Sequence, residues 1–511
     1  MIPILDAAGM READRVTIAE LGLPGLVLME RAATAVGDVV SERFADAGRV
    51  LVVCGPGNNG GDGLAVARQL VARGENAEAV LLVEPSHLRG DAAVQLALAR
   101  SFGVPVHECA NGPLDGLAAL LAETQVVVDA LFGTGLDRAL DGRWRSVIEL
   151  IEGAGWPVVA VDLPSGLSGS SGAVAGPSLR AAVTVTFGAP KLAHVLPPAS
   201  ERCGEVAVAD IGIPARLIER NAVAGLLEHD DVAAWLPVRE PSAHKGNFGH
   251  LLVIAGRVGR AGAAALAARA AVNLGAGLVT VATAEGAVTP IQSSVPEAMV
   301  DPLPQGGDGS VAGGGVEALL ERVTAVAIGP GLGLGAGPRR LLDDVLERWR
   351  GPLLLDADAL TLLDGRLERL AARGAETVLT PHPGELARLL GVDTAAVAGD
   401  RLGAARTASS RSGGTVLAKG ARTVIVAPGG RPLVNPTGGP GLASGGAGDV
   451  LTGAIGALLA QGLPGDQACA LGAWLHGRAA ELAADHWPGA VPASVVAAYL
   501  PAAEAELREP A

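Results

Sequence analysis

Short runs of Val, Ile and Leu recur along the chain, and most of them lead into a glycine-rich turn and then into a helical pattern. Strands that alternate with helices in this way are joined by right-handed crossovers into a parallel sheet. Helices cover both faces of such a sheet, which explains why the strands are aliphatic throughout. The composition fits, because 49% of the 511 residues are hydrophobic while only six Trp, five Phe and one Tyr are present. The sequence therefore predicts an α/β protein and excludes an intrinsically disordered chain.

The strand–helix pattern occurs in two sets, separated by a polar connector at residues 213–235. We place the boundary near residue 220, which gives domains at 1–219 and 224–505. The first set has expected strands at 50–54, 79–83, 126–129, 158–162 and 183–187, and helices at 8–21, 25–43, 64–73 and 92–102. The second set has expected strands at 251–255, 278–282, 325–328, 353–356, 377–379, 416–418 and 423–426, and helices at 261–274, 338–349, 384–390 and 449–461.

The net charge of the chain and its lack of targeting or membrane-spanning segments limit which ligands and which cellular location we expect. The chain carries 54 Asp and Glu against 39 Lys and Arg, a formal net charge of −15, and no basic cluster offers a footprint for nucleic acid. The start of the chain lacks the features of a signal peptide, and no apolar run reaches the roughly 18 residues of a membrane span. Cys54, Cys109, Cys203 and Cys469 lack metal-ligand spacing and are expected to be free thiols. We expect a cytoplasmic protein with small-molecule ligands.

A glycine-rich segment, Gly55-Pro-Gly-Asn-Asn-Gly-Gly-Asp-Gly63, follows the first expected strand. Its glycines satisfy the G-x-G-x-x-G pattern of dinucleotide-binding turns. Asn58, Asn59 and Asp62, however, fill the turn with side-chain oxygens, and Asp62 would repel a pyrophosphate at the helix start. Such a turn suits a hard cation or a hydroxylated ligand better. A tight turn with capping residues is the alternative.

Two further expected strands end in polar residues, one in Asp129-Ala-Leu-Phe-Gly-Thr-Gly135 and the other in Asp162-Leu-Pro-Ser-Gly166. The carboxyl ends of parallel strands meet at one crevice, where ligands bind. Asn59, Asp129 and Ser165 could therefore share one oxygen-lined cation site.

These segments, together with Met10-Arg-Glu-Ala-Asp14 and Leu28-Met-Glu-Arg31, resemble the NAD(P)HX epimerase domain over nearly all of residues 1–215. The resemblance implies a Rossmann-like domain that binds hydrated NAD(P)H and a potassium ion (K+). It implies Asn59, Asp129 and Ser165 as K+ ligands, and Asp129 also as a catalytic group for proton transfer at C6. A metal-bound carboxylate is a poor base unless its surroundings raise its pKa. The implied substrate-binding residues are Asn58, Asn59, Gly60, Gly61, Asp62, Gly133, Thr134, Gly135, Leu136, Asp137, Arg138, Ala139 and Asp162.

A second glycine-rich segment, Gly438-Gly-Pro-Gly-Leu-Ala-Ser-Gly-Gly-Ala-Gly-Asp449, leads into an expected helix. Free N–H groups and the positive end of the helix dipole stabilise phosphate at such a position. Asp449 could there accept a hydroxyl proton during phosphoryl transfer. Alternatively, Asp449 is an N-cap residue on a tight turn.

Five segments of the second half resemble the carbohydrate-kinase-like, ADP/ATP-dependent NAD(P)HX dehydratase domain over about residues 225–505. They are His244-Lys-Gly-Asn-Phe-Gly-His250, Ile328-Gly-Pro-Gly-Leu-Gly333, Leu354-Leu-Asp-Ala-Asp-Ala-Leu360, Thr380-Pro-His-Pro-Gly-Glu385 and Leu417-Ala-Lys-Gly-Ala-Arg-Thr423. The resemblance implies a ribokinase-like α/β domain with Asp449 as the catalytic base and Gly448 in the anion hole. The implied substrate contacts are Gly262, Gly331, His382 and Asp449, and the implied nucleotide contacts are Lys419, Gly420, Ala421, Arg422, Thr423 and Gly448. The implied cofactor is Mg2+ with ADP. The residues alone do not decide between ADP and ATP as the phosphoryl donor, and the resemblance to prokaryotic members favours ADP.

The two resemblances together predict a metabolite-repair enzyme that is both an isomerase and a lyase. The first half would interconvert (R)- and (S)-NAD(P)HX at C6, and the second would dehydrate the S form to NAD(P)H while ADP becomes AMP and phosphate. Two alternatives stay open. One is a small-molecule kinase of the hydroxymethylpyrimidine or hydroxyethylthiazole type with a dinucleotide-binding regulatory domain, and the other is a first domain that only binds. We expect NADHX, NADPHX and ADP as small-molecule partners, no nucleic acid, no membrane, and a homo-oligomer.

Overall fold

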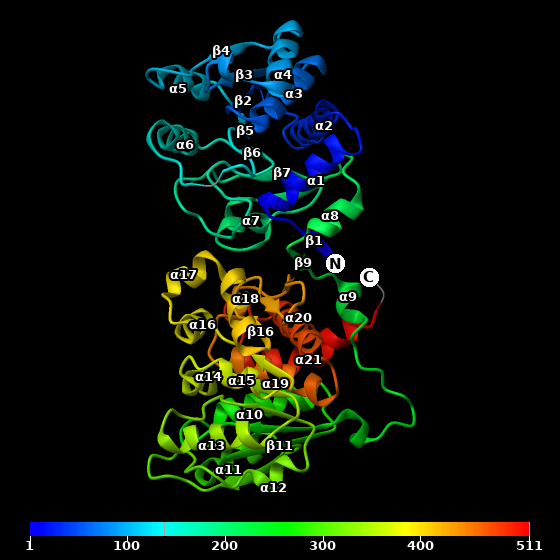
Figure 1. The fold of residues 1–511 in the computed structure, drawn as a ribbon, viewed down its shortest axis with the longest axis vertical. Helices are drawn as coiled ribbons and strands as arrows, with labels where there is room; N and C mark the ends of the chain where they lie inside the picture. Colours follow the sequence, from blue (N-terminus) through cyan, green and yellow to red (C-terminus); the bar gives the residue numbers. More distant parts are fainter. Residues whose placement is uncertain (47, 137, 510–511) are drawn as a thin grey trace. The chain divides into compact units, whose positions relative to one another are not determined.

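The computed structural model describes residues 1–46, 48–136 and 138–509 and is shown in Figure 1. The chain forms two compact units, one of Ile2–Ala224 and one of Gly225–Ala511 with Met1. The sequence predicted that the first domain ends at 219 and the second begins at 224, whereas α8 (Ala215–Asn221) continues past residue 219.

The first unit is built on a parallel sheet with the strand order β4-β3-β2-β5-β6-β7-β8. The strands of this unit are β1 (Ile2–Ile4), β2 (Val50–Cys54), β3 (Ala77–Leu81), β4 (Val106–Glu108), β5 (Val126–Ala130), β6 (Val158–Val161), β7 (Val183–Phe187) and β8 (Glu205–Ala209). Strands β2, β5, β6 and β7 are completely buried, so the helices must cover both faces of the sheet.

Alternate residues of the central strands pack on opposite faces of this sheet. Val50 and Val52 join one core with α2, α3 and α4, while Leu51 and Val53 join another core with α5 and α6. The helices of the unit are α1 (Ala7–Ala19), α2 (Gly25–Arg43), α3 (Asn58–Ala72), α4 (Gly90–Ser101), α5 (Asp115–Ala122), α6 (Gly142–Ala154), α7 (Leu192–Val195) and α8. Figure 1 shows α2, α3 and α4 on one side of the sheet and α5 and α6 on the other.

The second unit is built on a mixed sheet whose strands follow the order β9-β18-β17-β16-β15-β14-β13-β10-β11-β12. Pairing is antiparallel only for β16 with β17 and β17 with β18 among these described strands. The strands are β9 (Ala224–Leu226), β10 (His250–Ile254), β11 (Leu278–Ala284), β12 (Met299–Leu303), β13 (Ala325–Ile328), β14 (Leu353–Leu355), β15 (Thr377–Leu379), β16 (Thr415–Ala418), β17 (Val424–Val426) and β18 (Leu433–Val434).

Alanine-rich helices bury one face of this second sheet. Helices α10, α19, α20 and α21 share a single core with β10, β11 and β13, and small residues allow them to pack closely. At Gly453 in α19, a Cβ atom would lie only 2.0 Å from the Ala267 carbonyl oxygen of α10. The helices of the unit are α9 (His229–Ala233), α10 (Ala261–Asn273), α11 (Val288–Ser294), α12 (Glu317–Leu320), α13 (Ala336–Arg348), α14 (Asp358–Leu363), α15 (Glu368–Ala371), α16 (Pro383–Leu390), α17 (Thr394–Gly399), α18 (Arg401–Ser412), α19 (Ala447–Ala460), α20 (Gly465–Ala484) and α21 (Ala493–Leu507).

The predicted α/β fold is confirmed, with corrections at several element ends. Helix α3 begins at Asn58, although the sequence predicted a loop as far as residue 63. Close packing explains why glycine occupies these helical positions. A Cβ atom at Gly63 would lie only 2.4 Å from the Cβ atom of Ala130. The supposed connector at 213–235 is also wrong in part, since it contains α8, β9 and α9.

Cys54, Cys203 and Cys469 are buried and unpaired, and Cys109 is half-buried and unpaired. Among the helices that the structure describes, none has both the length and the apolar character needed to cross a membrane.

Candidate active sites

A cavity of about 470 Å³ lies at the carboxyl edge of the first sheet, beside the beginning of α3. Gly57 is the N-cap of α3, so Asn58 and Asn59 occupy its first turn. A Cβ atom at Gly60 would lie 2.1 Å from the Gly55 carbonyl oxygen, so only glycine lets the helix begin this close to the loop after β2. The free N–H groups of the first helical turn and two amide side chains thereby reach the cavity.

Behind the cavity, Asp129 at the end of β5 is bonded to Ser165 in the loop after β6. The Ser165 hydroxyl donates to Asp129 Oδ1 at 2.6 Å, and its backbone N–H donates to Oδ2 at 2.7 Å. The Leu131 N–H also donates to Oδ1, at 3.2 Å, and both Asp129 and Ser165 are fully buried. Burial raises the pKa of Asp129 to about 6, although these hydrogen bonds act in the opposite direction.

The donor set of these residues fits a potassium ion. Carboxylate, hydroxyl and amide oxygens are the ligands that hard cations prefer. The Nδ2 atom of Asn59 is buried without a hydrogen-bond partner among the described residues, and rotating the amide by half a turn would put an oxygen at this position. The Oδ1 atom of Asn59 lies 3.0 Å from the Cβ position of Gly133, in the loop whose Phe132 N–H donates to Ser165. Asn59 therefore meets the same loop that Asp129 and Ser165 hold.

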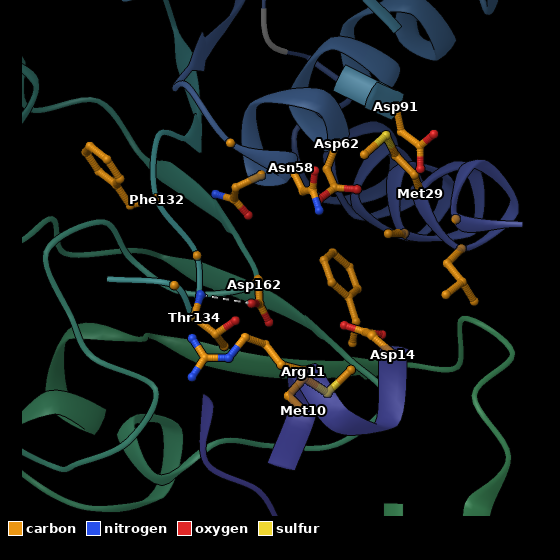
Figure 2. Close-up of a pocket in the computed structure, with 18 of the residues that line it drawn as sticks. Met10, Arg11, Asp14, Met29, Asn58, Asp62, Asp91, Phe132, Thr134 and Asp162 are labelled. Atoms are coloured by element: carbon orange, nitrogen blue, oxygen red, sulfur yellow. Dashed lines mark hydrogen bonds between the residues drawn. The ribbon is translucent and has the colours of Figure 1, made fainter. Parts of the chain in front are cut away.

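Asp162 is the most strongly fixed carboxylate of the cavity. Lys191 Nζ donates to its Oδ1 at 2.8 Å, and Thr186 Oγ1 donates to the same atom at 2.9 Å. Its Oδ2 accepts the Thr134 N–H at 3.4 Å, the dashed line in Figure 2. Burial opposes ionisation, but the charge and hydrogen bond of Lys191 outweigh it, so the pKa of Asp162 lies below its usual value. This carboxylate is ionised at neutral pH.

The backbone of Asp162 is held in an unusual conformation by His194. Its φ is +65°, in the left-handed region, which costs energy for any residue except glycine. His194 Nε2 donates to the Asp162 carbonyl oxygen at 2.8 Å, while Nδ1 accepts the Lys191 N–H at 2.9 Å. Burial lowers the pKa of His194 to about 4, so the ring stays neutral with its proton on Nε2.

Most of the predicted epimerase residues line this cavity: Asn58, Asn59, Asp62, Gly133, Thr134, Gly135, Leu136 and Asp162. Gly60 and Gly61 are buried and do not line it, and Arg138 and Ala139 are exposed outside it. Asp137 lies outside the residues that the structure describes.

Sequence reasoning gave no role to four charged residues of the cavity. Arg11 and Asp14 reach it from α1, Asp91 from α4, and Lys191 from the loop after β7. The position of Lys191 at a carboxyl strand end was a usable signal. The segment Met10–Asp14 was marked by its resemblance, but nothing in its pattern assigned a role to Arg11 or Asp14.

The second candidate site surrounds the beginning of α19. Gly446 is the N-cap with φ +93°, Gly448 occupies the first turn, and Asp449 follows. The Cβ position of Gly448 lies 3.5 Å from Lys419 Nζ, so a basic group faces the free N–H groups of this turn. Burial raises the pKa of Asp449 to about 6, with Asp356 adding to the rise and Lys419 opposing it.

Lys419 is itself paired with Asp356, which follows β14. Lys419 Nζ donates to Asp356 Oδ1 at 2.7 Å, and Thr452 Oγ1 of α19 donates to Oδ2 at 2.7 Å. The pKa of Lys419 is raised, because attraction to Asp356 and Glu385 outweighs burial. Sequence reasoning marked the segment that contains Asp356 but gave neither Asp356 nor Thr452 a role.

The predicted nucleotide-binding residues 419–423 form the tight turn between β16 and β17. Gly420 has φ +148° and Arg422 has φ +55°. Arg401 of α18 holds the turn by donating to the Ala421 and Arg422 carbonyl oxygens at 2.5 and 2.7 Å. Arg401 is a further residue that the sequence did not indicate.

The three remaining predicted substrate residues occupy different surroundings. Gly331 has φ +62°, and its Cβ position lies 3.1 Å from the Arg260 carbonyl oxygen, just before α10. Gly262 lines a groove of about 830 Å³ with Gly445, from the loop before α19. His382 is the N-cap of α16, where Nδ1 accepts the Gly384 and Glu385 N–H groups.

Fold and geometry together define an α/β chain with one candidate site in each of its two units. One unit has a cavity beside an oxygen-rich cluster and several carboxylates. In the other, a carboxyl group stands at a glycine-capped helix start, the kind of position that suits a phosphate group.

Comparison with known proteins identifies the family. Residues 251–502 match the family model described as NAD(P)H-hydrate dehydratase, and residues 25–193 match the model described as YjeF-related protein N-terminus. The bifunctional NAD(P)H-hydrate repair enzyme Nnr of Moorella thermoacetica is 41% identical over 492 residues, covering 94% of this chain and 92% of that protein. The enzyme of the same name from Escherichia coli is 38% identical over 480 residues, covering 94% of this chain and 89% of that protein.

A solved structure also matches, that of the ADP/ATP-dependent NAD(P)H-hydrate dehydratase of Bacillus subtilis co-crystallised with ATP/Mg2+. It is 31% identical, has a TM-score of 0.49, and covers 56% of this chain and 99% of that chain. From the matches over nearly its full length, the chain belongs to the family of bifunctional NAD(P)H-hydrate repair enzymes.

Proposed function

We propose that this chain repairs hydrated NADH and NADPH in two steps, with epimerisation at residues 1–219 and dehydration at residues 224–505. The observation that supports the proposal is one candidate site in each unit of a chain that aligns with bifunctional relatives over 94% of its length. Two sites in one chain suit this substrate, because spontaneous hydration produces both C6 epimers whereas the dehydratase would accept only the S form.

In the first unit, the start of α3 at residues 58–62 and the loop at 133–136 would hold the hydrated nicotinamide ring and its diphosphate. Asn59, Asp129 and Ser165 would hold K+, which supplies positive charge beside the bound substrate. Proton transfer at C6 by Asp129 stays a prediction. Both oxygens of Asp129 accept hydrogen bonds, and Asp129 is not among the residues that line the cavity.

In the second unit, Asp449 would accept the proton of the C6 hydroxyl while that oxygen attacks the β-phosphorus of ADP. The Gly448 N–H and the start of α19 would stabilise the charge on the transferred phosphoryl group, and the 419–423 turn would hold the nucleotide. The N1 lone pair then expels the phosphate from C6, and loss of a proton from C5 forms the C5=C6 double bond, which leaves NAD(P)H, AMP and phosphate. Phosphorylation thus turns a poor leaving group into a good one.

We propose that Mg2+ accompanies ADP at this second site. Asp356, Asp358 and Asp449 all lie close enough together for the first two to raise the pKa of the third. Lys419 alone does not balance three carboxylates, so a divalent ion carried by the nucleotide fits the local charge. When bound, it would neutralise charge on the phosphates.

The test is to incubate the full chain with a mixture of NADHX epimers and ADP and to follow the NADH absorption band. Complete recovery of NADH requires both activities, whereas recovery that stops at the S fraction indicates dehydration alone. No recovery, with phosphorylation of a thiamine precursor instead, would support the small-molecule kinase. Titrating ADP against ATP on (S)-NADHX then settles the phosphoryl donor.

A further inference from the structure

Asp14 is a carboxylate of the first cavity that has no assigned role. It lies on α1 and lines the cavity. The other charged groups that line it are Arg11 on the same helix, Asp62 of α3, Asp91 of α4, Asp162 and Lys191. Within the described part of the chain, neither a hydrogen bond nor an ion pair engages the Asp14 carboxylate, so its oxygens are available to a ligand.

Asp14 and Asp62 reach the cavity from different sides. Figure 2 shows Asp62 on α3 and Asp14 on α1, with other lining side chains drawn between them, while Asp162 lies beside Thr134. A ring bound in this cavity would therefore be within reach of carboxyl groups from two different helices. Inversion at a ring carbon needs a proton donor on one face and an acceptor on the other.

Burial and neighbouring charges raise the pKa values of Asp62 and Asp14 to different extents. Burial raises the pKa of Asp62 well above its usual value, and the nearby charges of Asp162 and Asp14 add to this rise. Burial also raises the pKa of Asp14, to about 6, but Lys191 limits the rise. Asp62 therefore holds its proton the more tightly of the two, while Asp14 ionises above about pH 6, which suits Asp62 to the role of acid and Asp14 to that of base.

We propose that Asp14 and Asp62 are the catalytic proton-transfer pair of the epimerase site, with Asp62 as the acid on one face of the ring and Asp14 as the base on the other. This proposal rests on the epimerase function proposed above and extends it.

The step balances without a further reactant. Asp62 gives its proton to the C6 hydroxyl, the C6–O bond breaks, and water leaves as the N1 lone pair forms an N1=C6 double bond. A second water then attacks C6 from the opposite face, Asp14 takes one of its protons, and the N1=C6 electron pair returns to N1. The product is the other epimer, with Asp62 ionised and Asp14 protonated. The pair is then set for the reverse direction, as a reversible epimerisation requires.

Asp14→Asn in the full chain tests the proposal. Interconversion of a pure NADHX epimer is measured without ADP, with the rate in protein-free buffer subtracted at each pH. We expect kcat to fall by about 10²- to 10⁴-fold with KM changed less than about threefold, the range for loss of a general base. Dehydration of (S)-NADHX with ADP should stay at the wild-type rate. Glu12→Gln, an exposed carboxylate on the same helix, is the matched control and should epimerise normally.

The pH profile and chemical rescue separate catalysis from a structural role. The wild-type kcat should fall below about pH 6 as Asp14 becomes protonated, and this acid limb should be absent in Asp14→Asn. Asp14→Ala should regain activity as formate is added, because formate can occupy the space of the missing carboxylate. Asp62→Asn should lose epimerisation to a similar extent.

The outcomes are distinct. Asp14→Asn that epimerises within threefold of wild type, or Asp14→Ala that formate does not rescue, overturns the proposal while leaving the epimerase function intact. A wild-type chain that epimerises no faster than buffer overturns the proposed function itself.

Discussion

Replacing Lys191 by Met tests how the first cavity holds a buried charge. Lys191 Nζ donates to Asp162 Oδ1, Thr186 Oγ1 and the Phe187 carbonyl oxygen at 2.8, 2.7 and 3.0 Å, and the side chain is fully buried. Methionine has a similar shape but leaves Asp162 without a counter-charge. Removing one member of a buried ion pair costs about 3–5 kcal/mol, so we expect the free energy of unfolding of the first unit to fall by this amount at pH 8.

The pH dependence of this loss gives the sharper test. In the wild type the pKa of Asp162 is depressed, so its stabilising contribution is present above the unfolded pKa and disappears as pH falls through the folded pKa. In Lys191→Met, burial is the largest remaining influence on Asp162 and raises its pKa, since only the hydrogen bonds from Thr186 and Thr134 and the smaller effect of His194 still oppose it. The folded variant then binds the proton more tightly than the unfolded chain and gains stability as pH falls. Since one pKa unit equals about 1.4 kcal/mol, the deficit should shrink by at least about 1 kcal/mol from pH 8 to pH 5.

Urea unfolding followed by hydrogen exchange in peptides from β6 and β7 reports the stability of the first unit alone. Lys245→Met, at an exposed lysine of the second unit, is the control and should leave this stability unchanged. A loss below about 1 kcal/mol at pH 8, or an equal loss at both pH values, would refute the argument that Lys191 compensates Asp162.

Three further predictions concern single side chains. Asp449→Asn should lower ADP-dependent dehydration by at least about 10²-fold, while calorimetry still detects ADP binding. The wild-type dehydration rate should fall below about pH 6, where Asp449 becomes protonated. Retained turnover in Asp449→Asn would exclude Asp449 as the base. Ser165→Ala should make epimerisation insensitive to added K+ while dehydration is unchanged, and a K+ response equal to wild type would remove Ser165 from the cation site. Thr452→Val should leave Asp356 Oδ2 without its donor and cost the second unit about 1–3 kcal/mol in urea unfolding, whereas a neutral result would mean that another donor replaces it.

The parts of the sites that sequence could predict are those set by position along a strand. Asp129, Asp162 and Ser165 follow buried apolar runs, and parallel topology brings such positions to one edge. The structure places all three at that edge, beside the start of α3. The same rule indicated the segment of Asp356 in the second unit.

Other contacts depend on packing between distant segments, and no local pattern announces them. Asp14 reaches the cavity only because α1 packs into the core of the first unit, and Arg401 supports the 419–423 turn from a separate helix. Propensity also misled the prediction at Gly60 and Gly63, where tertiary contacts select glycine inside a helix that glycine normally weakens.

The distribution of lysine connects the two sites. The chain has only three lysines, Lys191, Lys245 and Lys419, among 39 basic residues. Two of them form buried or nearly buried pairs with an aspartate at the carboxyl edge of a sheet, Asp162 in one unit and Asp356 in the other. At Lys191 the choice of lysine has a physical reason, because one compact ammonium reaches three acceptors that converge on a point, which a planar guanidinium does not match.

Each of these pairs stands beside a carboxyl group that it does not neutralise. Asp62 and Asp14 adjoin the Lys191–Asp162 pair, and Asp449 adjoins the Lys419–Asp356 pair. Because lysine and aspartate largely cancel within each pair, burial remains the main influence on the neighbouring carboxyl group and raises its pKa. The two units thus share one electrostatic arrangement, in which a fixed ion pair lies beside a separate carboxyl group with a raised pKa, and it is to these separate carboxyl groups that we assign proton transfer.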